Sequence, residues 1–101
     1  MDEPIAGFDW DAGNLEHCRK HGVSRLEIES VFSGPVILLP DAAQSRTEHR
    51  SRAIGKTGSG RHVFVVFTIR QRGGHRAIRP VSARYMHQEE IKGYEEDTPG
   101  L

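Results

Sequence analysis

Three strand-like stretches joined by two glycine-rich turns constrain the fold of this chain more than any other feature. The stretches cover residues 50–55, 61–70 and 76–83, and the turns have the sequences Lys-Thr-Gly-Ser-Gly and Gln-Arg-Gly-Gly-His. Consecutive strands joined by short turns of this composition pair antiparallel. The second half of the chain therefore predicts a meander of three strands.

Two further strands are expected before this meander. Phe8 and Trp10 alternate with aspartates, which predicts a strand over residues 5–10. An apolar run bracketed by prolines predicts a short buried strand over residues 36–39.

Helix-capping residues place two helices between these strands. Asp11 or Asn14 can cap the first helix, which is expected to end near His21 with Gly22 as its left-handed cap. Ser24 and the glutamate three residues later form a capping box, which begins the second helix, and a Gly-Pro pair ends it.

A third helix is expected near the C-terminus, where His87, Ile91 and Tyr94 return to a helical spacing. We expect residues 97–101 to be a disordered tail. The predicted element order is βααββββα within one domain of residues 1–101. The predicted fold class is α+β, a twisted antiparallel sheet with two N-terminal helices and one C-terminal helix packed on it.

The sequence also argues against several classes of protein. Its longest uninterrupted apolar stretch, residues 63–67, is far shorter than the ~20 residues of a membrane-spanning helix. Its first residues are acidic where a signal peptide is basic. Cys18 is the single cysteine, which excludes an internal disulfide and a multi-cysteine zinc site. We therefore expect a cytoplasmic protein that contacts no membrane.

Charge is distributed very unevenly along the chain, although fourteen basic and fourteen acidic residues cancel in total. Residues 1–44 contain three basic and eight acidic side chains, residues 45–84 contain ten and one, and residues 85–101 contain one and five. The net charges are −5, +9 and −4. The central block favours binding to a polyanion such as RNA. The alternative is that the acidic flanks fold back and pair with the basic strands.

Two motifs that resemble ligand sites have simpler interpretations. The Gly-Lys-Thr at 55–57 lacks both the glycine five residues earlier and the following helix that a phosphate-binding loop needs, which favours a hairpin turn. His17 and His21 are four residues apart, but a catalytic zinc site needs a third ligand. Two surface histidines are the favoured interpretation and a metal-dependent hydrolase is the weaker one, so we assign no metal and no cofactor.

A collinear series of short motifs spans nearly the whole chain. It begins with Phe8-x-Trp10 and with Asn-Leu-Glu-His-Cys-Arg-Lys-His-Gly-Val-Ser at residues 14–24, and continues through Glu27-x-x-x-Val31-Phe32-x-x-Pro35, Glu48-x-Arg50, Ala53-Ile54-Gly55, Gly60-Arg61, Phe67-Thr68-x-Arg70 and Val81-Ser82-Ala83-Arg84. In this order, over residues 8–96, the chain resembles the BrnT toxin family. It departs from the family at Pro80, where the family's strand usually continues with isoleucine-rich sequence.

The resemblance implies a RelE-like α+β fold and a ribonuclease that is the toxin of a type II toxin-antitoxin pair. Such a toxin inhibits translation and is neutralised by a cognate antitoxin. We expect the antitoxin to carry a ribbon-helix-helix DNA-binding domain, so that DNA is contacted only through it.

Metal-independent RNA cleavage needs a group that accepts the 2′-hydroxyl proton, cations that stabilise the phosphate, and an acid or cation that assists the departing 5′-oxygen. Arginine suits the phosphate because its planar fork binds two oxygens and stays charged. His21 or Glu48 could accept the proton, and three of the arginines could converge on one sheet face. The candidate catalytic residues are Lys20, His21, Glu48, Arg50, Arg70 and Arg84, and the candidate RNA-binding residues are Arg52, Arg61, Arg72 and Arg76.

Structural roles are the alternatives: a helix-terminal contact for His21, a cross-strand ion pair for Glu48, and bracing of the last helix for Arg84. The competing class of function is a noncatalytic module that binds RNA or an acidic protein through the same cations. We expect the aromatic side chains of Phe8, Trp10 and Tyr94 to pack in the core and not to stack on bases.

Overall fold

The computed structural model describes residues 5–40 and 49–97. Their elements follow the predicted order, with the first helix continuing as one 3-10 turn. They are β1 (Ile5–Phe8), α1 (Ala12–Cys18), the 3-10 helix η1 (Arg19–His21), α2 (Arg25–Val31), β2 (Val36–Pro40), β3 (Ser51–Lys56), β4 (His62–Arg72), β5 (His75–Tyr85) and α3 (Gln88–Asp97). The predicted strands and helices are therefore confirmed to within a few residues at their ends.

The five strands form one mixed sheet in the order β1-β5-β4-β3-β2. The strands β2 to β5 are antiparallel neighbours, as expected. The α+β class is confirmed, but the prediction of a wholly antiparallel sheet is wrong at one edge, because β1 runs parallel to β5. Ile5 pairs with Arg76, and both N-terminal helices and three strands separate β1 from β5 in the chain, so the direction of β1 is not set by a hairpin.

Both glycine-rich segments form hairpin turns. Arg72 pairs with His75, which leaves Gly73 and Gly74 as a two-residue loop with φ values of 55° and 85°. Positive φ at both positions is what this kind of tight hairpin requires. The other segment joins β3 directly to β4, and the N–H of Thr57 donates to the carbonyl of Arg61 at 2.8 Å. The interpretation of Gly-Lys-Thr as a hairpin is therefore confirmed.

The two N-terminal helices begin at capping boxes. Asp11 is the cap of α1, and its side chain accepts from the N–H of Asn14 at 3.1 Å while the Asn14 side chain accepts from the N–H of Asp11 at 2.8 Å. Ser24 and Glu27 form the expected box at the start of α2. Gly22 lies between the helices with φ of 84°, in the left-handed region predicted for it.

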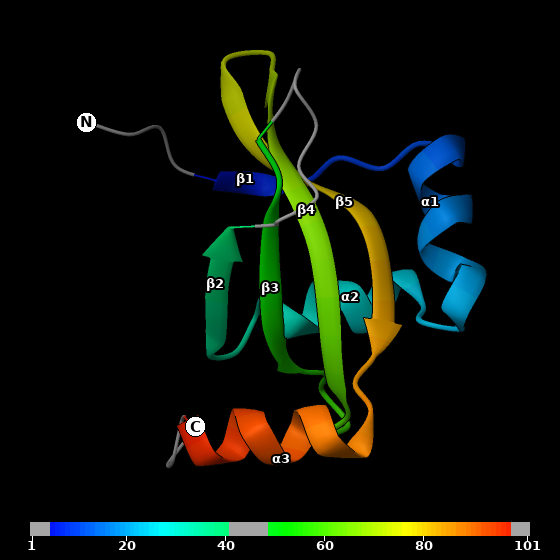
Figure 1. Cartoon of the computed structure of the whole chain (residues 1–101). Coiled ribbons are helices and arrows are strands. Elements are labelled where there is room, and N and C mark those ends of the chain that lie inside the picture. Colours follow the sequence, from blue (N-terminus) through cyan, green and yellow to red (C-terminus); the bar gives the residue numbers. More distant parts are fainter. Residues whose placement is uncertain (1–4, 41–48, 98–101) are drawn as a thin grey trace.

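The main core lies between α2 and one face of the sheet. Figure 1 shows α2 behind β3 and β4, and α3 across the other side near one end of the strands. Phe8, Phe32 and Phe67 meet edge to face in the main core, with ring centroids 5.8 Å and 5.2 Å apart for successive pairs. Trp10 packs against that core, and Tyr94, a residue of α3, is buried in a second cluster with Ile54 and Met86. The core assignment of the N- and C-terminal aromatic residues is therefore confirmed.

One extra residue in β5 changes which side chains share a face. Val66 pairs with Ser82 and Phe67 pairs with Pro80, which leaves Val81 as the bulge residue. A bulge accommodates proline, which has no N–H for the strand ladder. The freed carbonyl of Pro80 is satisfied by the buried amide of Asn14, which donates to it at 2.8 Å.

Two sequence predictions concern residues outside the described ranges. Glu48 lies there, as does most of the expected tail, whereas Asp97 is the last residue of α3. Within the described ranges, the helices are all too short or too polar to span a membrane.

Candidate functional site

Arginines from three strands gather on the sheet face opposite α2. Strand pairing aligns Arg52 with Val66 and Ser82, and aligns Ile54 with Phe64 and Arg84. Directly paired residues project to the same side of a sheet. α3 covers the end of this face, where Ile54, Met86 and Tyr94 form a second cluster. We call the part of this face beyond α3 the arginine face, defined by Arg50, Arg52, Arg70, Arg79 and Arg84.

The first of two hollows on the arginine face has a volume of about 170 Å³. We call it the Phe64 hollow. Two guanidinium groups lie over the Phe64 ring, with the Cζ atom of Arg52 at 5.5 Å and that of Arg84 at 4.4 Å from the centroid. His21, the last residue of η1, also lines this hollow. The lining includes His21, Arg52, Phe64, Val66, Ser82 and Arg84.

The second hollow, which we call the Arg70 hollow, has a volume of about 390 Å³. Val81 lines it and the next residue, Ser82, lines the Phe64 hollow, so the two hollows adjoin along β5. Each hollow combines arginines from the sheet with one histidine from the α1–η1 segment. The lining of the Arg70 hollow includes Asn14, His17, Arg50, Arg70, Arg79 and Val81.

The three arginines expected to converge share a face but not a hollow. Arg84 pairs with Phe64, which is six residues from Arg70 along β4. At about 3.3 Å per residue, the two arginines are separated by roughly 20 Å along the strand direction. Arg50 and Arg70 are thus brought together, whereas Arg84 joins His21 and Arg52. The arrangement suits an extended ligand that contacts both hollows.

Arg84 is held by a carboxylate from α3. Its Nη1 and Nη2 atoms donate to the two oxygens of Glu90 at 2.9 Å and 2.8 Å. The N–H of His87 donates to the same carboxylate at 2.8 Å. Because Arg84 and this N–H stabilise the ionised form, the pKa of Glu90 falls to about 2 from its ordinary value of 4.5. The pair is the contact expected if Arg84 braces the last helix.

Acidic residues from the N-terminal flank also fold back onto the basic strands. Asp9 binds Arg72 at 3.1 Å and Arg79 at 3.3 Å, and Asp11 binds Arg79 at 3.0 Å. These hydrogen bonds lower the pKa of Asp11 and raise that of Arg79. The alternative of acidic flanks pairing with the basic block is therefore correct for Arg72 and Arg79, and for Arg84 through the C-terminal flank.

Three other sequence candidates lie away from the two hollows. The guanidinium of Arg61 lies 3.4 Å from the ring centroid of Tyr85, whose hydroxyl donates to Glu27 of α2 at 2.9 Å, which places Arg61 at the helix-covered face. Arg76 shares that face with Ile78 by strand alternation. Lys20 lines a separate hollow along α1 and η1.

The Cys18 thiol is fully buried between two exposed histidines. Burial raises its pKa to about 11, so it is a core residue and not a nucleophile. His17 and His21 line different hollows. Among residues 5–40 and 49–97, no three His, Cys, Asp or Glu side chains are grouped so that they could hold a metal ion.

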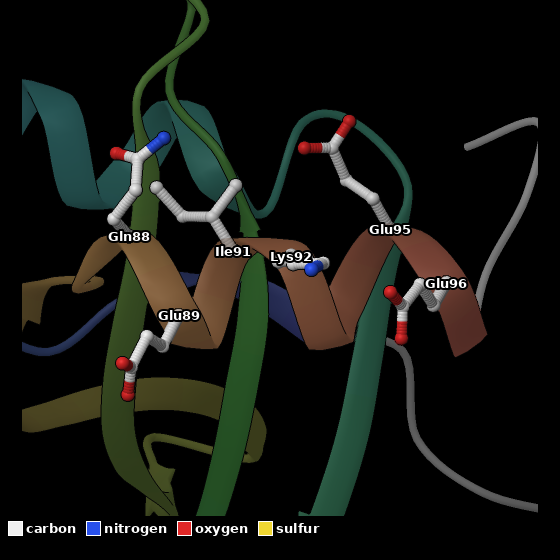
Figure 2. A pocket seen from close by; sticks show the side chains of 6 residues that line it. All are labelled: Gln88, Glu89, Ile91, Lys92, Glu95 and Glu96. Atoms are coloured by element: carbon white, nitrogen blue, oxygen red, sulfur yellow. The ribbon is translucent and has the colours of Figure 1, made fainter.

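A further hollow of about 500 Å³ runs along α3 and has the opposite electrostatic character. Figure 2 shows Gln88, Ile91 and Glu95 extending from one side of this helix and Glu89 from the other. With three glutamates and one lysine in its lining, this hollow would repel a phosphate backbone. The arginine face is therefore the better nucleic-acid interface.

Sequence reasoning missed the placement of Arg79 on the arginine face. Strict alternation backwards along β5 from Arg84 would place Arg76 on this face and Arg79 on the other. The bulge at Val81 reverses that parity, so that Arg79 pairs with Thr68 beside Arg70. The proline in the middle of this strand was the available signal, since proline within a sheet is confined to edges and bulges. Phe64 and Ser82 were also missed, because an isolated residue in a strand has no distinctive pattern.

Comparison with models of known protein families gives a match over most of the chain. Residues 10–90 match the family model described as a ribonuclease toxin, BrnT, of type II toxin-antitoxin systems. The matched range contains every lining residue named for the two hollows of the arginine face. No curated protein sequence matches the chain.

Proposed function

Because this chain belongs to the BrnT family of ribonuclease toxins of type II toxin-antitoxin systems, we propose that it cleaves RNA in the Phe64 hollow without a metal ion. Cleavage of RNA would inhibit translation. The arrangement of His21 beside Arg52 and Arg84 is the single observation that carries this assignment. It places an imidazole that can accept a proton close to positive charge from the sheet.

In the proposed reaction the 2′-oxygen of one nucleotide attacks its own 3′-phosphorus. The neutral imidazole of His21 accepts the 2′-hydroxyl proton as the new oxygen–phosphorus bond forms. The bond to the 5′-oxygen of the next nucleotide breaks, and this oxygen takes a proton from water. The hydroxide that remains takes the proton from His21, which returns to its neutral form. The products are a 2′,3′-cyclic phosphate and a 5′-hydroxyl.

Cations on the arginine face stabilise the charge that develops on the phosphate. Arg52 lies in the same hollow as His21 and binds the non-bridging oxygens of the reacting phosphate. Arg50 and Arg70, in the adjoining hollow, hold neighbouring phosphates and set the register of the strand. Lys20 precedes His21 in the chain but lines a separate hollow, so it contributes positive charge only from a distance. Glu48, outside the described residues, is the alternative proton acceptor.

The remaining parts of the proposal concern the fold family and the partner. A sheet with two helices before β2 and one after β5 is consistent with a RelE-like toxin. We propose that the cognate antitoxin covers the arginine face and carries a ribbon-helix-helix domain through which the pair contacts DNA. A positive face of this kind favours an acidic antitoxin segment.

Product analysis tests the proposed reaction. Purified protein is incubated with a labelled single-stranded RNA, and the new ends are identified. We expect 2′,3′-cyclic phosphate and 5′-hydroxyl ends from the wild type, with His21→Ala binding the RNA but cleaving it about a hundredfold more slowly. Ends with a 3′-hydroxyl and a 5′-phosphate would contradict attack by the 2′-hydroxyl. Binding without any cleavage by the wild type would favour the noncatalytic module.

A further inference from the structure

The guanidinium group of Arg84 is held from two directions. Glu90 binds both of its Nη atoms, at 2.9 Å and 2.8 Å. The ring of Phe64 lies beneath its Cζ atom, which is 4.4 Å from the ring centroid. A planar group that is bound along one edge and supported on one side has little freedom to rotate. Its position is therefore set before any ligand arrives.

Arg84 remains accessible at the hollow despite these contacts. Its side chain is 39% exposed, and it lines the Phe64 hollow together with Ser82. The two Nη atoms that would grip a phosphate already bind the Glu90 carboxylate. The same carboxylate caps the first turn of α3 through the N–H of His87, so an incoming phosphate that displaced it would also uncap the helix. Stacking needs no such exchange, because it uses the plane of the guanidinium and not its edge.

We infer that Arg84, supported by Phe64, is a stacking platform for one unpaired nucleobase of a single-stranded RNA. Bases that are splayed out of a strand stack on aromatic rings or on the planes of arginine side chains. In a duplex the bases are already stacked on each other, so this platform selects single-stranded RNA. The inference rests on the proposed function, since it assumes that RNA lies on the arginine face.

The Phe64 hollow is consistent with one base and one phosphate held side by side. Its lining is apolar at Phe64 and Val66 and also contains Arg52 and His21. The Ser82 hydroxyl can donate to or accept from the edge of a stacked base. Arg84 is therefore a positioning residue that fixes the nucleotide next to His21, and Arg52 is the phosphate-binding arginine of this hollow.

Binding of RNA analogues that cannot be cleaved tests the platform without relying on catalysis. The probes are single-stranded hexanucleotides with 2′-O-methyl groups throughout, either complete or with one abasic nucleotide at each position in turn. For the wild type we expect one abasic position to weaken binding by about tenfold, the size of one base stack. In Arg84→Lys and Phe64→Leu this loss at that position should shrink to less than about twofold, because the platform is gone while the net charge is kept.

Arg61→Lys is the matched control, since Arg61 also lies over an aromatic ring, that of Tyr85, but at the helix-covered face. This variant should keep the full abasic effect. Thermal unfolding of each variant confirms that it is folded, and Phe64→Tyr, which keeps an aromatic ring, should also keep the effect.

The outcomes separate the platform from the proposed function. If binding is salt-sensitive but no abasic nucleotide weakens it at any position, the platform is wrong and the proposed function is unaffected. An abasic effect that persists in Arg84→Lys and Phe64→Leu would also overturn the platform. If the complete hexanucleotide did not bind at all, or bound equally well to a protein with Arg50 and Arg52 replaced by alanine, the placement of RNA on the arginine face would be wrong.

Discussion

Arg84 and Glu90 connect the last strand to the last helix through two hydrogen bonds, 2.9 Å from Nη1 to Oε1 and 2.8 Å from Nη2 to Oε2. The Oε1 atom also accepts the N–H of His87 at 2.8 Å. One carboxylate thus caps α3, attaches it to β5 and orients an arginine of the candidate site. The stability of α3 and the proposed RNA platform therefore depend on the same pair.

Replacing Arg84 with alanine is expected to destabilise the protein as well as weaken its binding of RNA. Arg84→Ala removes a bidentate ion pair that is only partly exposed. This should lower the free energy of unfolding by about 1 kcal/mol and the melting temperature by roughly 4–8 °C. Arg25→Ala is the control, because the Arg25–Glu29 pair is an exposed i,i+4 contact worth less than about 0.5 kcal/mol. Circular dichroism melts at neutral pH measure both. Equal melting temperatures for wild type and Arg84→Ala would show that Arg84 does not brace α3.

Acid should weaken the Arg84–Glu90 pair in a defined pH range. The pKa of Glu90 is lowered to about 2 in the folded protein from an ordinary value of 4.5. Between these values the unfolded state binds more protons, so the stabilisation is complete above about pH 4.5 and is lost as the pH falls toward 2. The stability difference between wild type and Glu90→Gln should follow this curve in urea titrations. The same measurement on Glu89→Gln, at an exposed neighbouring position, should show a small and flat difference.

The two histidines at the arginine face provide a matched pair of substitutions. His21→Ala should lower the cleavage rate at saturating RNA about a hundredfold, the usual size of general-base catalysis. His17→Ala, in the adjoining hollow, should weaken RNA binding without changing that rate more than about threefold. Single-turnover cleavage at two RNA concentrations separates the effects. If His17→Ala lowered the cleavage rate about a hundredfold and His21→Ala left it unchanged, the reaction centre would be the Arg70 hollow.

Chelators should leave the activity of the purified protein intact. The proposed chemistry uses His21 and arginines, and it routes no step through a metal ion. Cleavage of a labelled RNA is measured with and without EDTA, and after addition of Zn²⁺. Loss of activity in the chelator with recovery on adding zinc would instead support the metal-dependent hydrolase.

The antitoxin and RNA should compete for the arginine face. Association with the antitoxin is expected to slow as salt is raised, because screening weakens attraction to a cationic surface. Excess antitoxin should release a bound 2′-O-methyl RNA in a fluorescence-anisotropy titration. Undiminished RNA cleavage in a saturated, stable complex would show that the antitoxin does not act by covering this face.

Local features of the fold could be predicted from the sequence because their causes lie within a few residues. The Ser24 capping box, the left-handed Gly22 and the Gly73–Gly74 hairpin all appear where their patterns indicated. Each depends on short-range hydrogen bonds or on backbone conformation, which the residue types determine. The charge of the central block was equally plain, since net charge needs no structure.

Only the tertiary structure decided which of these charges act together. The parallel pairing of β1 depends on contacts between Ile5 and Arg76 that no local pattern encodes. The bulge at Val81 moves Arg79 onto the arginine face and leaves Arg76 on the other. Side chains of neighbouring residues in a strand point in opposite directions, so one inserted residue reassigns every side chain beyond it. The sequence therefore predicted a cationic central block in a chain of zero net charge, whereas strand register and long-range pairing determined that His21, Arg52 and Arg84 share one hollow.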